Sequence, residues 1–197
     1  MAYSPRDLAS LHGALLRRNA SRWDEMVELP QWVSLAQHVV DKIVANKARY
    51  ELVSSRTSVP WELVGVIHDR EASLSWLANI ANGDPWNKRT IHEPSLRGPF
   101  KSWEDAAEDA LLRCPPFAGR WSDWSTSGAL TLLELYNGVG YANMGLPSPY
   151  IWSGTNQYTK GKFVADHHFD PDAVDHQLGC AIMLSQIYKR SPRDAVS

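Results

Sequence analysis

Two carboxylic acids and a hydroxyl group follow one another within a short stretch of this sequence. Glu71 ends a predicted helix, Asp84 lies in an Asn-Gly-Asp-Pro segment, and Thr90 comes six residues after Asp84. Glycosidases use an acid that protonates the leaving oxygen, a carboxylate across the bond that is broken, and a bound water. The residue types and their order therefore predict the cleavage of a glycosidic bond.

Glu71 continues the apolar face of its predicted helix. Val64, Ile67 and His68 precede it at the spacing i, i+3, i+4, with Glu71 at i+7. A carboxyl group on that face is partly removed from water and lies near the negative end of the helix dipole, and both effects raise its pKa. Such a group can stay protonated near neutral pH and act as a general acid. Alternatively, Glu71 pairs with Arg70 or faces water.

The other two candidate catalytic residues and His68 also have structural interpretations. Asn-Gly-Asp-Pro is an ordinary turn sequence, so Asp84 can serve the turn alone. In the catalytic interpretation, Asp84 activates water or stabilises an oxocarbenium-like transition state, and Thr90 positions that water. His68 lies one turn before Glu71, where it contributes to a substrate cleft or is a hydrogen-bonded core histidine. These alternatives stay open at the level of sequence.

Tryptophan is unusually frequent, with nine residues in a chain of 197. Indole rings stack on the apolar faces of sugars, and they also fill protein cores. We expect most of the nine to be core residues and two or three to line a site.

Several short motifs accompany these residues in a fixed order. The motifs are Val59-Pro60-Trp61, Asn82 to Pro85, Arg89 to Pro94, Trp103 to Ala107, Tyr136 to Tyr141 and Ser148 to Trp152. As an ordered set they resemble phage endolysins and prophage-encoded lysozyme-family proteins of the lysozyme superfamily, over about residues 57–165. One interval departs from the phage-type pattern, because twelve residues instead of eight separate Glu71 from Asp84, whereas five still separate Asp84 from Thr90.

The resemblance implies a mainly α, lysozyme-like α+β fold, in which a helical bundle and a small β-hairpin lobe enclose a cleft. It implies a muramidase, which cleaves bacterial peptidoglycan between N-acetylmuramic acid and N-acetylglucosamine during cell lysis. Glu71 carries over as the acid, with Asp84 and Thr90 as its partners. The alternatives are a lytic transglycosylase that uses Glu71 alone and a glycan-binding module without catalysis.

The resemblance also suggests substrate-binding residues. Tyr136 and Asn137 resemble a Tyr-Asn pair that faces the cleft in transglycosylases, although Tyr136 can equally be a core residue and Asn137 a helix cap. Tyr150 and Trp152 either form a platform for a sugar or hold down the long loop that contains them.

Acidic and imidazole side chains gather before and within the predicted last helix. They are Asp166, His167, His168, Asp170, Asp172 and His176. Such clusters can bind zinc, as a peptidase that cuts wall peptides does. This one lacks a known ligand spacing such as His-Glu-x-x-His, and its aspartates suit the start of a helix. We therefore expect no metal and no cofactor.

Apolar periodicity and capping residues predict a chain of helices. The predicted helices cover about residues 7–18, 31–54, 58–71, 102–114, 127–138 and 171–189. Residues 81–99 form an irregular lobe with a small hairpin near Lys88 to His92, and residues 142–170 form a long loop of the kind that is often functional. We assign residues 1–30 to a loosely ordered N-terminal arm and residues 31–197 to the catalytic domain.

Charge and hydropathy limit the partners and the compartment. The net charge of −2 does not favour nucleic acid, and the longest apolar runs are too short to span a membrane. The N-terminus lacks the apolar segment of a signal peptide, so we expect synthesis in the cytoplasm and action on the cell wall, by phage-mediated release or as part of a virion. The same reasoning predicts a monomer in which Cys114 and Cys180 are free thiols.

Overall fold

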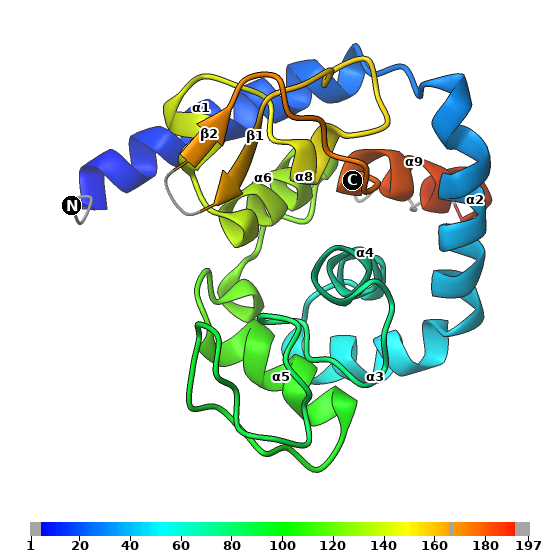
Figure 1. Cartoon of the computed structure of the whole chain (residues 1–197), viewed down its shortest axis with the longest axis vertical. Coiled ribbons are helices and arrows are strands. Elements are labelled where there is room, and N and C mark those ends of the chain that lie inside the picture. Colours follow the sequence, from blue (N-terminus) through cyan, green and yellow to red (C-terminus); the bar gives the residue numbers. More distant parts are fainter. Residues whose placement is uncertain (1–4, 166–167, 192–197) are drawn as a thin grey trace.

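The computed structural model describes residues 5–165 and 168–191 of the chain, and these are mainly helical with a small two-stranded antiparallel sheet (Figure 1). This confirms the mainly α class. In chain order the elements are α1 (Pro5–Asp24), α2 (Pro30–Ala45), α3 (Lys47–Thr57), α4 (Trp61–Ala72), α5 (Trp103–Arg113), the 3-10 helix η1 (Ala118–Arg120), α6 (Thr126–Asn137), α7 (Gly140–Asn143), α8 (Pro149–Trp152), β1 (Lys162–Ala165), β2 (His168–Asp170) and α9 (Cys180–Arg190).

Helix α4 occupies the middle of the molecule. In Figure 1 it lies between α3 and α5 on one side and α6, α8 and α9 on the other. Its residues 62–68 are all buried, and the chain is tightly packed around it. A Cβ at Gly65 would lie only 2.5 Å from Cγ2 of Ile43, so α2 can approach α4 because this position has no side chain. Trp61 at the start of α4 and the last turn of the helix are partly open to solvent.

The single helix predicted over residues 31–54 is wrong, because the chain turns at Asn46 and forms α2 and α3 in its place. Asn46 has φ −108° and ψ 15°, and its Nδ2 donates to the carbonyl of Lys42 at 2.9 Å. The turn lets α2 pack on α9 while α3 packs on α4 and α5. The apolar periodicity continues across the turn, so the sequence pattern gave no sign that the helix ends there.

The hairpin predicted at residues 88–92 is also wrong, since no strand forms there. Hydrogen bonds from side chains, described below, organise residues 73–101 together with scattered backbone hydrogen bonds, such as that from the N–H of Thr90 to the carbonyl of Arg97 at 2.9 Å. The only sheet in the described residues is β1 with β2, where Lys162 pairs with Asp170 and Phe163 with Phe169. The prediction therefore put a small hairpin in the wrong part of the chain.

The last helix starts later than predicted, at Cys180 instead of near residue 171. Oδ1 of Asp170 accepts from the backbone N–H groups of Asp172 and Ala173 at 2.8 and 3.2 Å, which makes a turn at the predicted helix start. Asp175 then points inward to form buried ion pairs. The segment before α9 is therefore a loop.

The first helix is longer than predicted and packs against α6. Nδ2 of buried Asn19 donates to Oγ1 of Thr131 and to Oε2 of Glu134, each at 3.1 Å. These polar contacts fix the register of α1 on α6.

Among the described residues, no helix combines the length and apolar character needed to cross a membrane. Cys114 and Cys180 are both buried and unpaired, which confirms the prediction of free thiols.

Candidate functional site

Glu71 lies in the last turn of α4, where the residue is half-buried. Oη of Tyr150 donates a hydrogen bond to its Oε1 at 2.8 Å. Burial raises the pKa of Glu71 to about 7, against the opposing effects of the Tyr150 hydrogen bond and the Arg70 charge. A carboxyl group with this pKa holds its proton for part of the time at neutral pH, as the apolar spacing of α4 predicts.

The chain reverses direction directly after Glu71. Ser73 takes a left-handed conformation with φ 49°, and the N–H of Leu74 returns to the carbonyl of His68 at 3.2 Å. A Cβ at Gly83, where φ is 76°, would lie 3.2 Å from the carbonyl oxygen of Glu71. The end of α4 thus contacts the backbone of the segment that carries Asp84.

The carboxylate of Asp84 is committed to its own loop. Its Oδ2 accepts from the N–H groups of Ile91 and His92 at 2.8 and 3.0 Å, and its Oδ1 lies 2.7 Å from Nδ1 of His92. The backbone hydrogen bond from His92 is the main cause of a lowered pKa at Asp84. Asp84 is therefore an ionised group that closes the loop.

The hydroxyl of Thr90 is committed in the same way. It donates to the carbonyl of Pro94 and accepts from the N–H of Arg97, both at 3.0 Å, and the residue is buried. The loop is also held by a bidentate ion pair from Arg97 to Asp109 of α5. Both contacts of the Thr90 hydroxyl are with backbone groups of its own loop.

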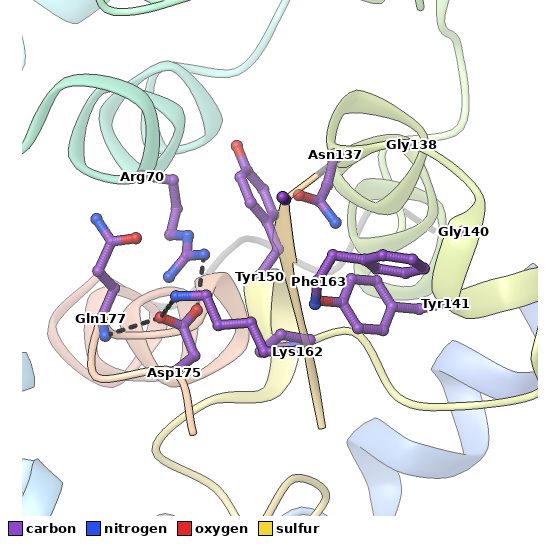
Figure 2. Close-up of a pocket in the computed structure, with 12 residues that line it drawn as sticks. Arg70, Asn137, Gly138, Gly140, Tyr141, Tyr150, Lys162, Phe163, Asp175 and Gln177 are labelled. Carbon is purple, nitrogen blue, oxygen red and sulfur yellow. Dashed lines mark hydrogen bonds and ion pairs between the residues drawn. The ribbon is translucent and has the colours of Figure 1, made fainter. Parts of the chain in front are cut away.

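A pocket of about 360 Å³ is joined to Glu71 by Tyr150, and Figure 2 shows residues that line this pocket. The pocket is lined by Arg70, Asn137, Gly138, Gly140, Tyr141, Pro149, Tyr150, Lys162, Phe163, Ala165, Asp175 and Gln177. Glu71 is not itself a lining residue. The aromatic ring of Tyr150 forms part of the wall, while its hydroxyl reaches the Glu71 carboxyl. Asp84 and Thr90 are absent from the lining.

The two residues of the predicted pair, Tyr136 and Asn137, have different surroundings. Oη of Tyr136 donates to the carbonyl of Ile80 at 2.8 Å, so Tyr136 ties α6 to the loop after α4. Asn137 is exposed on the pocket wall, where its Nδ2 donates to Oγ of Ser148 at 3.2 Å. Asn137 and Tyr150 are thus the two predicted substrate-binding residues that the structure brings to one pocket.

Trp152 and His68 are core residues, so their predicted contact with substrate is incompatible with the structure. Trp152 is fully buried and has no face to offer a sugar. His68 is also fully buried, with its Nδ1 3.0 Å from Oη of Tyr50 and its Nε2 3.0 Å from the carbonyl of Ser75. Burial lowers the pKa of His68 to about 4, so this imidazole is neutral.

A buried ion cluster that the sequence analysis missed forms the floor of the pocket. Asp175 accepts from Nη2 of Arg70 at 3.1 Å and from Nζ of Lys162 at 3.0 Å. Burial pushes the pKa of Asp175 upward, but the Arg70 charge and the Lys162 hydrogen bond more than offset it, and the pKa falls. Because Arg70 and Asp175 are 105 positions apart in the sequence, no local spacing could have indicated the pair.

The His/Asp-rich segment shows no metal site in the part that is described. Asp166 and His167 lie outside the described residues. Elsewhere in the described chain, no group of three His, Cys, Asp or Glu side chains is arranged to hold a metal ion. Asp170 accepts backbone hydrogen bonds and Asp172 pairs with Lys160 at 2.5 Å.

No protein-family model, curated protein or solved structure matches this chain. The geometry around Glu71 and its pocket therefore carries the functional case.

Proposed function

We propose that this protein is a lysozyme-like glycoside hydrolase that cleaves peptidoglycan strands between N-acetylmuramic acid and N-acetylglucosamine, with Glu71 as general acid. The supporting observation is the Glu71 carboxyl, which has a pKa of about 7 and is held by Tyr150 at the edge of a pocket. The ordered motifs and the mainly helical fold are consistent with this proposal. Peptidoglycan as substrate means that the protein works at the cell wall.

In the proposed reaction, Glu71 gives its proton to the oxygen of the leaving sugar as the bond from that oxygen to C1 breaks. Water adds to C1 and returns a proton to the Glu71 carboxylate, which restores the acid. Tyr150 restricts the rotation of the carboxyl by its hydrogen bond to Oε1. The partly desolvated position keeps the pKa close to the working pH, which favours proton transfer in both directions.

One observation favours a second candidate, a lytic transglycosylase. Three hydrogen-bonding contacts occupy the two oxygens of Asp84, so this carboxylate is poorly placed to activate water. A transglycosylase needs only Glu71. Glu71 first gives its proton to the leaving oxygen as the bond from that oxygen to C1 breaks. The resulting Glu71 carboxylate takes the proton of the C6 hydroxyl of N-acetylmuramic acid, and the C6 oxygen bonds to C1 and forms a 1,6-anhydro ring.

Mass spectrometry of the products released from purified peptidoglycan separates these candidates. Muropeptides with reducing N-acetylmuramic acid support the hydrolase, and anhydro-muropeptides support the transglycosylase. Release of free peptides, or no release at all, would contradict both and favour a peptidase or a binding module. For either enzyme, product formation should decline as the pH rises through about 7, because Glu71 then loses the proton that it must donate.

A further inference from the structure

The pocket beside Glu71 carries more positive than negative charge. Among the described lining residues, Arg70 and Lys162 are cationic and Asp175 is anionic. Both oxygens of Asp175 are engaged, one by Arg70 and the other by Lys162 and the N–H of Gln177. The single carboxylate therefore has little capacity left, and the lining residues by themselves carry one more positive than negative charge.

Lys162 is the cation that a ligand can reach. Its side chain is 36% exposed, against 6% for Arg70, and its ammonium has three N–H donors, of which one is directed to Asp175. In Figure 2 it extends from β1 across the pocket towards Asp175. Arg70 binds the other oxygen of the same Asp175 carboxylate, and it also donates to the carbonyl of Leu178 at 3.0 Å.

The pocket also has aromatic walls, and one of its rings, that of Tyr150, belongs to the residue that contacts the acid. The rings of Phe163 and Tyr141 meet edge to face at 5.0 Å, and the guanidinium of Arg70 lies 4.6 Å from the ring centre of Tyr150. Since the hydroxyl of Tyr150 contacts Glu71, a substituent next to the cleaved bond can enter this pocket. A ligand that fits has an aliphatic part for the rings and an anionic group for Lys162.

We propose that Lys162, supported by Arg70, binds a carboxylate of the peptide stem on the muramic acid next to the cleaved bond. The inference rests on the proposed function, and it makes Lys162 a specificity-determining residue. Peptide-bearing glycans would then be preferred over chemically similar glycans that lack the charged stem.

Binding to a Glu71→Gln protein tests this without turnover. The probe is the disaccharide-tetrapeptide of peptidoglycan, used with free carboxylates and with the same carboxylates converted to methylamides, in calorimetric titrations. We expect the free form to bind about tenfold tighter, as one partly exposed charge-assisted contact allows. Adding Lys162→Gln should remove this difference, and adding Lys162→Arg should keep most of it.

Lys160→Gln in the same background is the matched control. Lys160 is an exposed lysine paired with Asp172 outside the pocket, so its removal should leave the preference for carboxylates unchanged. Thermal melting of each variant verifies folding. Equal affinity for the two forms, no binding, or a preference that survives Lys162→Gln would overturn the proposal. If binding depends on Lys162 and the carboxylates but the wild type cleaves no peptidoglycan, the pocket assignment holds and the hydrolase assignment fails.

Discussion

The last turn of α4 and the loop that follows it each carry a carboxylic acid, and the two groups have different surroundings. Glu71 accepts one side-chain hydrogen bond, from a tyrosine, and burial raises its pKa to about 7. Asp84 accepts two backbone hydrogen bonds and contacts His92, and its pKa is lowered. The first carboxyl can exchange a proton near neutral pH, whereas the second stays ionised and holds the backbone.

The comparison shows that burial raises the pKa of one carboxyl, which has a single side-chain partner, whereas backbone donors lower the pKa of the other. Three partners satisfy Asp84, and such a group stabilises the conformation that supplies them. A single partner leaves Glu71 with acceptor capacity and a proton that can be transferred. The experiments below test this contrast.

The largest expected difference is catalytic. Glu71→Gln should lower the rate of peptidoglycan cleavage by about 10³-fold, because an amide has no acidic proton to donate. Asp84→Asn, assayed at a temperature where it is folded, should lose less than about tenfold, since its role is structural. Rates of release of soluble fragments by both variants and the wild type measure the contrast. A comparable loss in Asp84→Asn would restore Asp84 as a catalytic partner.

A smaller effect is expected on the stability of the loop. Asp84→Asn should reduce the free energy of unfolding at pH 7 by about 1–3 kcal/mol, because a neutral amide oxygen replaces the charged acceptor of two backbone hydrogen bonds. The pKa of Asp84 is lowered in the folded state, so this contribution exists above its ordinary pKa and disappears as the pH falls through the folded value. Urea unfolding at pH 7 and pH 3 measures it, with Asp24→Asn as an exposed control. Equal losses at both pH values would contradict the assignment.

The smallest effect has the opposite sign. The pKa of Glu71 is raised in the folded state, so its favourable contribution is complete below the ordinary value and is lost as the pH rises through about 7. At pH 8 Glu71→Gln should therefore be more stable than the wild type, by about 1–2 kcal/mol after allowance for partial exposure. Near pH 4 the two proteins should be nearly equal. Thermal unfolding at both pH values tests this, and destabilisation at pH 8 would show that the charged form of Glu71 is favoured.

Local patterns predicted the helical class and the position of Glu71. The spacing of Val64, Ile67 and Glu71 depends only on the geometry of one helix, so the sequence was enough to place Glu71 on the apolar face of α4. The break at Asn46 and the ion cluster of Arg70, Lys162 and Asp175 depend on packing between distant segments, which no local pattern records. The hydrogen bonds of Asp84 could not be predicted either, because they are made with backbone groups of residues 91 and 92.

The complete burial of residues 62–68 in α4 has a consequence for motion. Backbone amides enclosed by packing on every side open only when most of the molecule unfolds, whereas those of an irregular loop open locally and often. Glu71 lies at the end of α4, next to the irregular loop that follows the helix. Glu71, the proposed proton donor, is therefore anchored next to the slowest-opening part of the protein.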